Sequence, residues 1–295
     1  MKNKENPNRE LRRFKLLKRY GLFGDDTKGL KIVRATTALD LQKAYRLVHD
    51  IFVEKQYILP LKSKIRIRPW ETSPDTATFI GKKEDNVLAV QSLILDSEDL
   101  KLPSDRIFGE ELDALRKSGA KLSEASNEAV ADSYRKSAVP TELMRTLLAQ
   151  AWHSECKYIV TSISPSHRNF YEFLGFRQQG DIKSFSLDIE DPVALMCWDI
   201  EESLEKWADI AADEDSVEAF LKKYGYITNP YIPAIGLWAY QAKRLFSDTA
   251  QMRELFGNCY DLFDTATPDQ IDAIRNRLGP VFEQVYSDSM EQMMA

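Results

Sequence analysis

The sequence predicts an α/β (α+β) fold in which a mixed, mostly antiparallel central sheet is flanked by helices and followed by a helical extension. Between residues 31 and 202, short runs of β-branched and large apolar residues alternate with segments that carry apolar residues at helical spacing. After about residue 202 only helical patterns remain. We therefore divide the chain into an N-terminal basic arm (1–30), a sheet domain (31–202) and a helical C-terminal extension (203–295).

Local patterns predict each element. Thr37 and Asp40 form a capping-box pattern ahead of apolar residues that recur every three or four positions, which indicates a helix. Ser164-Pro165 opens and Gly175 closes a short helix that follows a buried strand. The expected strands are 31–35, 76–80, 87–95, 121–131, 158–162, 183–189 and 192–200, and the expected helices are 38–55, 140–154, 164–175, 203–222, 236–247, 249–264 and 268–290.

The composition argues against several classes of protein. No apolar run approaches the roughly 18–20 residues of a membrane-spanning helix, and the polar N-terminus does not resemble a secretory signal. Three scattered cysteines without a CxxC pair argue against a disulfide framework or a cysteine zinc site, and three histidines argue against a histidine-rich metal site. The formal net charge of −6 argues against a nucleic-acid partner. We expect a cytoplasmic protein without a bound metal.

Opposite charges gather at the two ends of the sheet domain. Residues 1–20 hold eight Lys and Arg and two Glu, a net +6, whereas residues 199–218 hold nine Asp and Glu and one Lys, a net −8. Leu11, Phe14 and Leu17 recur at helical spacing among the cations of the arm. Two interpretations stay open for the arm, a flexible tail and a peripheral contact with an anionic inner membrane.

The most specific pattern lies at residues 162–180, which read SISPSHRNFYEFLGFRQQG. A strand runs into a short helix that carries Phe170-Tyr171 and ends at Leu-Gly-Phe, and this resembles the FYxxLGF signature of the GNAT acyltransferase superfamily. The stretches ATFIGKKEDNVLAVQSLILD, LPSDRIFGEELDALRKSGAKLSEASNEAVADSYRKS and PxHxxFY resemble the bacterial N-acyl amino acid synthases of FeeM type, relatives of the acyl-homoserine-lactone autoinducer synthases. The likeness covers about residues 31–202 and implies a GNAT-like sheet.

The resemblance implies catalytic roles for three residues. Tyr171 matches the superfamily tyrosine, which would protonate the leaving thiol, and the alternative is a core aromatic residue. Glu124 matches the glutamate of the E-x-S motif of the synthases, which would contact or help deprotonate the amine. His167 matches the histidine of the PxHxxFY pattern and would orient the donor or relay a proton. The alternative for His167 is a structural or exposed histidine.

The strand over 121–131 supports a site from its own pattern. Two-residue periodicity puts Glu124, Ser126 and Glu128 on one face unless a bulge intervenes, and polar side chains on an internal strand need partners. We take Ser126 and Asn127 as substrate-binding candidates. Asn127 stands where the autoinducer synthases carry Arg, which weakens any inference about their substrate. The alternative is a strand that faces solvent.

The acyl donor is expected at the end of the same strand. By resemblance, the backbone there hydrogen-bonds a pantetheine arm in the manner of an added strand, and the helix N-terminus that follows attracts phosphate. The loop has no glycine to let the backbone wrap a pyrophosphate, so it suits the single phosphodiester of a carrier-bound phosphopantetheine. The alternative is an ordinary strand–helix connection with surface cations. The donor-binding candidates are Ala129, Val130, Arg135, Lys136, Ser137 and Ala138.

A row of cations precedes the hairpin. If residues 61–70 (LKSKIRIRPW) are extended, Lys62, Lys64, Arg66 and Arg68 share one face. Such a row is either a solvated strand face or, together with the basic arm, a docking stripe for an acidic acyl carrier protein. Two further residues lie where the related synthases shape their amino-acid and acyl pockets, namely Trp70 and Thr78.

The resemblance and the site together predict an N-acyltransferase. We expect it to move a long-chain fatty acyl group from acyl carrier protein, or from acyl-coenzyme A, to the α-amine of an amino acid. The phosphopantetheine-linked donor is then a co-substrate, and no permanently bound cofactor is needed. Two alternatives stay open, an autoinducer synthase that also lactonises S-adenosylmethionine and a catalytically degenerate GNAT fold used as a binding module.

Overall fold

The computed structural model of the chain describes residues 19, 24, 26–185, 191–202, 229–257, 259, 261–264 and 266–294. Nearly all of the basic segment 1–20 lies outside these residues, as do the predicted helix over 203–222 and most of the acidic segment 199–218. No helix in the described ranges is long and apolar enough to cross a membrane.

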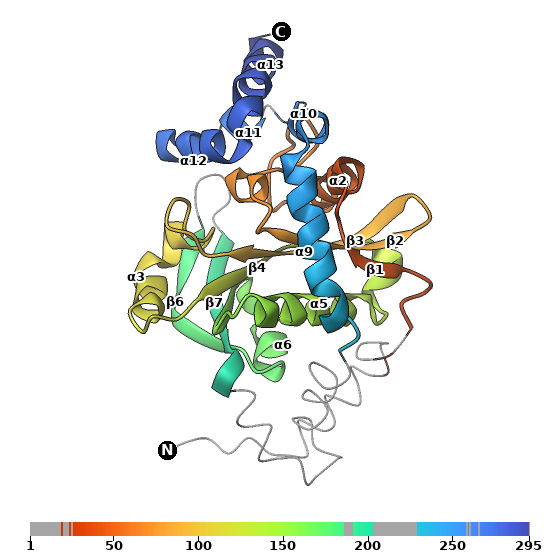
Figure 1. Cartoon of the computed structure of the whole chain (residues 1–295). Coiled ribbons are helices and arrows are strands. Elements are labelled where there is room, and N and C mark those ends of the chain that lie inside the picture. Colours follow the sequence, from red (N-terminus) through yellow and green to blue (C-terminus); the bar gives the residue numbers. More distant parts are fainter. Residues whose placement is uncertain are drawn as a thin grey trace, which may run out of the picture.

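In the described part of the chain, seven strands form one sheet in the order β1-β2-β3-β4-β5-β7-β6 (Figure 1). Every neighbouring pair is antiparallel except β4 and β5, which run parallel. The predicted mixed, mostly antiparallel sheet is therefore confirmed. The strands are β1 (Lys31–Arg34), β2 (Ala77–Lys83), β3 (Asn86–Leu95), β4 (Leu122–Val130), β5 (Tyr158–Ile163), β6 (Arg177–Phe185) and β7 (Asp191–Asp199).

Different helices cover the two faces of the sheet. Helix α2 (Ala38–Glu54) begins at Thr37, whose side chain accepts a hydrogen bond from the backbone of Asp40, as the capping pattern predicts. Its apolar stripe packs on the face that carries Ile80 and Val90. Helix α5 (Val139–His153) packs on the opposite face, which carries Phe79 and Leu93. Both faces are thus buried, which accounts for the apolar runs of the central strands.

The C-terminal helices pack against the helices on both faces of the sheet. Helix α9 runs beside α5, where Ile235 joins the α5 core and Trp238 meets Phe79 edge-on with ring centroids 6.1 Å apart (Figure 1). The helices that follow share the apolar cluster of α2. They are α9 (Ile232–Ser247), α10 (Thr249–Phe256), α11 (Asp261–Asp264), α12 (Pro268–Leu278) and α13 (Phe282–Met294).

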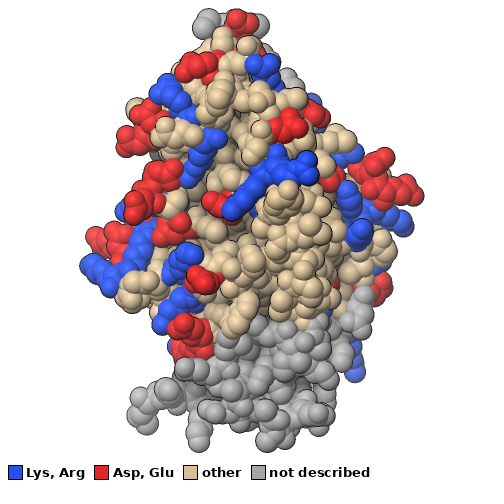
Figure 2. Space-filling model, in the orientation of Figure 1, with Lys and Arg blue, Asp and Glu red and all other residues tan. Residues whose placement is uncertain are grey.

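The surface over α9 and α5 is less charged than its surroundings. Figure 2 shows a broad patch of uncharged side chains on this face, with Lys, Arg, Asp and Glu gathered around it. Leu237 and Tyr240 on α9 are 60% and 61% exposed, and Trp152 on α5 is 51% exposed.

The structure differs from the sequence prediction at several elements. The segment 61–70 is not extended, so the condition for a shared face of cations is not met: it is a loop with Lys64 at φ 55° that ends in the 3₁₀-helix η1 (Pro69–Thr72). Helix α3 (Asp105–Arg116), which carries Gly109 and a kink at Phe108, was not assigned by periodicity. Strand β6 begins six residues earlier than expected. The helix expected over 268–290 breaks at Gly279, which has φ 52° and precedes Pro280.

Candidate active site

The parallel pair β4 and β5 holds together over three residues only. Backbone pairing runs from Leu122 with Tyr158 to Glu124 with Val160 and is not continued beyond in the described residues. Strand β4 goes on to Val130 with β3 as its partner, and β5 goes on to Ile163 with β7 as its partner. The edges of β4 and β5 that face each other past Glu124 therefore carry backbone donors and acceptors that are available to an extended ligand.

A β-bulge in β4 changes which side chains share a face. Ser92 pairs with Ser126 and Val90 pairs with Ala129, so one residue of β3 lies opposite two of β4. Asn127 adopts φ 55°, a conformation that Asn tolerates better than most residues. The bulge keeps Asn127 on the face of Ser126 and turns Glu128 to the opposite face. The expectation that Glu128 shares a face with Glu124 and Ser126 is therefore wrong.

Hydroxyl groups line the α2 side of the sheet beside the bulge. Thr78, Ser92 and Ser126 are cross-strand neighbours on β2, β3 and β4 and so share one face. Thr78 Oγ1 lies 2.9 Å from Tyr45 OH on α2 and 3.0 Å from Ser92 Oγ. Tyr45, Thr78 and Ser92 are buried, and the hydrogen bonds among them satisfy their hydroxyl groups, whereas Ser126 is half-buried.

The two arginines of the loop before η1 point into this row. Arg68 forms an ion pair with Glu71, whose side chain is fully buried, through contacts of 2.5 and 3.2 Å, and Arg68 Nη2 donates to Ser126 Oγ at 3.2 Å. Arg66 Nη1 donates to Asn127 Oδ1 at 2.6 Å. Asn127 Nδ2 donates to Glu71 Oε1 at 2.9 Å, which closes the network.

This network corrects the predicted docking stripe. The four cations do not share a face, because Lys62 and Lys64 are exposed whereas Arg66 and Arg68 are half-buried against β4. Buried Ile65 and Ile67 hold the loop against α2 and draw the two guanidinium groups inward. Arg66, Arg68 and Glu71 are thus site residues that the sequence reasoning missed. The alternation of cations had no feature to distinguish it from a solvated strand.

Glu124 occupies the point where β4 and β5 separate. Its carboxylate accepts hydrogen bonds of 2.9 Å from the backbone N–H and from the hydroxyl of Ser104, and Ser104 Oγ lies 2.7 Å from Ser162 Oγ on β5. Burial raises the pKa of the Glu124 carboxyl to about 7, although the Ser104 hydrogen bonds and the charge of Arg68 lower it. A carboxyl group with this pKa takes up and releases protons near neutral pH.

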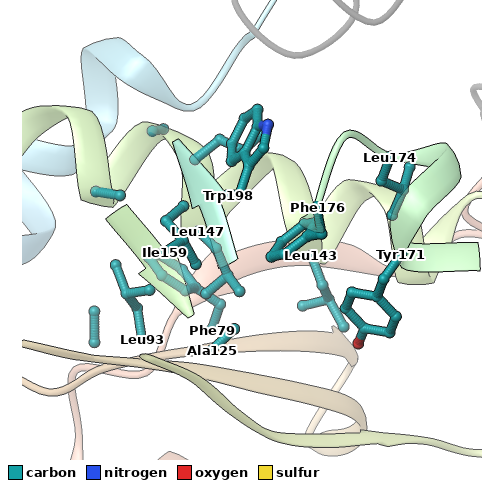
Figure 3. Packing of buried hydrophobic residues seen from close by; sticks show 14 of the residues in the cluster. Phe79, Leu93, Ala125, Leu143, Leu147, Ile159, Tyr171, Leu174, Phe176 and Trp198 are labelled. Carbon is teal, nitrogen blue, oxygen red and sulfur yellow. The ribbon is translucent and has the colours of Figure 1, made fainter. Parts of the chain in front are cut away.

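Tyr171 lies on the other face of β4, in the α5 cluster that also holds Ala125 (Figure 3). Helix α6 (Arg168–Phe173) follows β5 after the short η2 (Pro165–His167), and Tyr171 meets Phe176 edge-on with centroids 5.2 Å apart. Its hydroxyl donates to Glu128 Oε2 at 3.2 Å. Burial and the Glu128 carboxylate raise the pKa of Tyr171 well above its usual range, so the phenol stays protonated.

Gly175 explains why the motif helix ends where the sequence predicts. It adopts φ 96°, and a Cβ at this position would lie 3.1 Å from Trp198 Nε1. The turn brings Phe176 onto the Trp198 ring with centroids 5.9 Å apart, which fixes the wall against which Tyr171 packs. His167 is exposed, and its charge acts on the Glu128 carboxyl.

The loop expected to bind phosphate is already partly occupied by the chain itself. The Ala138 N–H donates to the carbonyl of Asp26 at 3.0 Å, and the Val139 N–H donates to Ser137 Oγ at 3.2 Å. Lys28 Nζ donates to the carbonyl of Ser133 at 2.6 Å. Residues 26–28 therefore lie against this loop, and the Ala138 amide is not free for a phosphate.

The two cationic side chains of this loop differ in their contacts. Arg135 Nε donates to the carbonyl of Val130 at 2.9 Å and its guanidinium pairs with Asp132 at 2.5 Å, whereas Lys136 is exposed. The backbone of Ala129 and Val130 pairs with β3 on one side and borders the separation from β5 on the other.

The remaining predicted residue, Trp70, adjoins the network through Arg68, whose guanidinium lies 5.4 Å from the centroid of the Trp70 ring. It belongs to an apolar cluster with Ile94 and Phe108, and its Nε1 donates to the carbonyl of Lys101 at 2.9 Å. Among the described residues, no group of three or more His, Cys, Asp and Glu side chains is placed to hold a metal ion.

Comparison with known proteins decides the family. The sequence profile described as N-acyl amino acid synthase FeeM matches residues 43–199, more than half of the chain. The chain belongs to this family. It is therefore an N-acyltransferase, and the predictions of a GNAT-like fold and of an acyltransferase are confirmed.

Solved structures with a similar fold include other acyltransferases. FeeM, an N-acyl amino acid synthase from uncultured soil microbes, is 25% identical, with a TM-score of 0.51 over 59% of this chain and 92% of that chain. The coenzyme A-dependent acyl-homoserine lactone synthase BjaI, solved with S-adenosylmethionine and isopentyl-CoA, is 16% identical, with a TM-score of 0.48 over 72% and 100%. A putative N-acetyltransferase from Lactobacillus plantarum is 14% identical, with a TM-score of 0.42 over 58% and 98%. No curated protein matches the chain in sequence.

Proposed function

We propose that this member of the FeeM family transfers a long-chain fatty acyl group from the phosphopantetheine thioester of an acyl carrier protein to the α-amine of an amino acid. The observation that carries the proposal is Glu124, a buried carboxyl with a pKa of about 7 at the point where β4 and β5 separate. A thioester threaded along the exposed edge of β4 would present its carbonyl beside this carboxyl. Tyr171 would stand on the opposite face of the strand.

The proposed reaction uses one base and one acid. Glu124 takes a proton from the ammonium group of the acceptor, so that the neutral amine attacks the thioester carbonyl. The C–N bond forms, the nitrogen loses its second proton to solvent, the C–S bond breaks, and the thiolate takes the proton of the Tyr171 phenol. The phenol regains a proton from solvent, with Glu128 as its hydrogen-bond acceptor in the resting state. Much of the acceleration comes from holding amine and thioester together.

The donor side of the proposal rests on backbone and surface groups. Ala129 and Val130 would bind the pantetheine amides along the edge of β4. Lys136 is exposed at the end of this edge and would meet the single phosphate, with Arg135 beside it. The Ala138 amide already donates to Asp26 and would not be available to a phosphate. A carrier-bound phosphodiester requires fewer contacts with this loop than the pyrophosphate of coenzyme A, so this arrangement favours the carrier-bound donor. His167, exposed next to Glu128, would relay protons to solvent.

The acceptor side uses the row on the α2 face. Ser126 and Asn127 would contact the amino acid, and Thr78, with Trp70 further along the same face, would border its side chain or the acyl chain.

The test is a reaction of the purified chain with palmitoyl-carrier protein or palmitoyl-coenzyme A and a mixture of the twenty amino acids, followed by mass spectrometry. We expect an N-acyl amino acid, formed faster from the carrier protein, and a loss of at least 100-fold in the Glu124→Gln variant. Glu110→Gln, an exposed carboxylate on α3, serves as the matched control. A lactone formed from added S-adenosylmethionine would favour the autoinducer synthase instead. Absence of transfer from any thioester would favour a binding module.

A further inference from the structure

On the α2 face, one of the two guanidinium groups forms no ion pair with a described carboxylate. Arg68 and Glu71 neutralise each other in an ion pair. The side-chain hydrogen bond of Arg66 goes to the neutral amide of Asn127. The charge of Glu71 acts on Arg66, but within the described residues no carboxylate forms an ion pair with it. Burial and the charge of Arg68 lower the pKa of Arg66 to about 9, so the guanidinium remains cationic at neutral pH. A half-buried cation without a counter-charge is costly unless an anion completes it.

The geometry of Arg66 leaves it open to a ligand. The guanidinium lies over the Phe52 ring, 5.0 Å from its centroid, a favourable cation–π contact that helps to hold it in place. Only Nη1 makes a side-chain hydrogen bond to a described residue, and the side chain is half-buried rather than enclosed. A guanidinium in this state offers the two parallel N–H donors that a carboxylate accepts.

The hydrogen bond to Asn127 positions the guanidinium group of Arg66 without neutralising its charge. The bulge holds Asn127 at φ 55°, and its Nδ2 is engaged by Glu71, so its Oδ1 faces Arg66. An aspartate in this place would neutralise the guanidinium, and an arginine would repel it. The neutral amide is therefore the residue type that positions a cation and leaves its charge available.

Arg66 and Glu124 border the same row of β4 side chains on the α2 face. Arg66 contacts Asn127, Arg68 contacts Ser126, and Glu124 lies two residues before Ser126. With its amine at Glu124, the acceptor would direct its carboxylate toward the end of the row where Arg66 lies.

We infer that Arg66 binds the α-carboxylate of the acceptor and thereby restricts the enzyme to amino acids over simple amines. This inference rests on the proposed function. It assigns the selection of the acceptor to Arg66, which the sequence pattern alone places in a row of surface cations. The same contact would orient the amine toward Glu124, because the two groups of the zwitterion are fixed to one carbon.

The experiment compares an amino acid with its carboxamide, which keeps the side chain and the amine but lacks the negative charge. We expect the wild-type chain to prefer the acid by roughly 100-fold in kcat/KM, a value typical of a partly buried charge pair. Arg66→Gln should reduce the preference to less than 5-fold by raising KM for the acid, and Arg66→Lys should retain part of it. Lys55→Gln, at an exposed lysine that follows helix α2, should keep the full preference.

Two failures are distinguishable. If the wild-type chain acylates acid and amide equally well, the role of Arg66 is contradicted while the acyltransfer reaction stands. If it acylates neither, the proposed function itself is contradicted. The wild-type comparison needs no variant, and circular dichroism and thermal unfolding of Arg66→Gln show whether its loss of preference occurs in a folded chain.

Discussion

The hydroxyl of Tyr171 donates a hydrogen bond to Oε2 of Glu128 at 3.2 Å, across the separation between β5 and β4. This hydrogen bond links helix α6, which follows β5, to the bulged strand β4. Glu124 and Glu128, four residues apart on β4, serve opposite faces because Asn127 adds one residue between them. This arrangement places the proposed base and the proposed acid on either side of one strand edge, and each role can be tested separately.

Tyr171→Phe removes the proposed acid and keeps the ring that packs on Phe176. We expect kcat to fall about 100-fold with little change in KM, because general acid catalysis contributes at this level. The deficit should shrink with an aryl thioester, whose thiol leaves readily without a proton. Tyr240→Phe, on an exposed tyrosine of α9, should leave the rates unchanged. An equal deficit with both kinds of leaving group would contradict the assignment.

The pKa of Glu124, about 7, sets the pH dependence of the reaction. Below this value the carboxyl is protonated and cannot accept a proton from the amine, so kcat/KM for the thioester should rise with pH through an inflection near 7. The measurement is a rate profile from pH 5 to 9. Glu124→Gln should lose the inflection together with most of the activity, and a wild-type profile that is flat between pH 6 and 8 would contradict the role of Glu124.

The same raised pKa affects stability. A carboxyl in the unfolded chain ionises near pH 4.3, about the ordinary value, whereas in the folded chain Glu124 holds its proton to about pH 7. Between these values the folded state binds the extra proton, so the wild-type fold loses stability as pH rises through this window. Urea unfolding at pH 5 and pH 8 should show a smaller loss for Glu124→Gln, and the opposite difference would contradict the buried state of this carboxyl.

Glu71 holds Arg68 directly and Arg66 through Asn127. Its side chain is fully buried and accepts from both Arg68 and Asn127. Glu71→Gln leaves Arg68 without its counter-charge and should lower the free energy of unfolding by about 3 kcal/mol. Denaturant unfolding measures this value, and Glu54→Gln, on the exposed Glu54–Lys55 pair, should change it little. A near-neutral Glu71→Gln would mean that the network does not hold the loop.

The exposed lysines before η1 remain candidates for carrier-protein docking. Reversing both charges, Lys62→Glu with Lys64→Glu, should raise KM for acyl-carrier protein several-fold and leave KM for acyl-coenzyme A unchanged. Activity with the carrier-bound donor should also fall as salt rises, because exposed charges are screened. Lys117→Glu at the end of α3 is the matched control. Equal effects of the lysine changes on both donors would contradict docking at this loop.

The fold was largely predictable because its signals are local. Apolar periodicity set the strands and the helices α2 and α5, and the pair Leu174-Gly175 marked the end of the motif helix. Helix α3 was missed because Gly109 and the kink at Phe108 interrupt its apolar repeat. Only the folded chain shows that Ala138 donates to the carbonyl of Asp26, since the two lie far apart in sequence.

The motif residues of the candidate site were predictable from the sequence, whereas its arginine network and its geometry were not. Glu124 and Tyr171 stand in recognisable motifs, but their faces depend on the bulge at Asn127, a single positive φ that no local pattern requires. Arg66 and Arg68 were assigned to a surface stripe because their alternation is the same in a solvated strand and in a loop turned inward. Their partners lie on β4, about sixty residues later in the chain.

The most direct test of the central claim is mass spectrometry of lipid extracts from cells that overproduce the chain, compared with cells that produce the Glu124→Gln, Tyr171→Phe double variant. The proposed function predicts N-acyl amino acids with long acyl chains in the first extract and their absence in the second. Equal amounts in both extracts, or an acylated amine without a carboxylate as the main product, would contradict it.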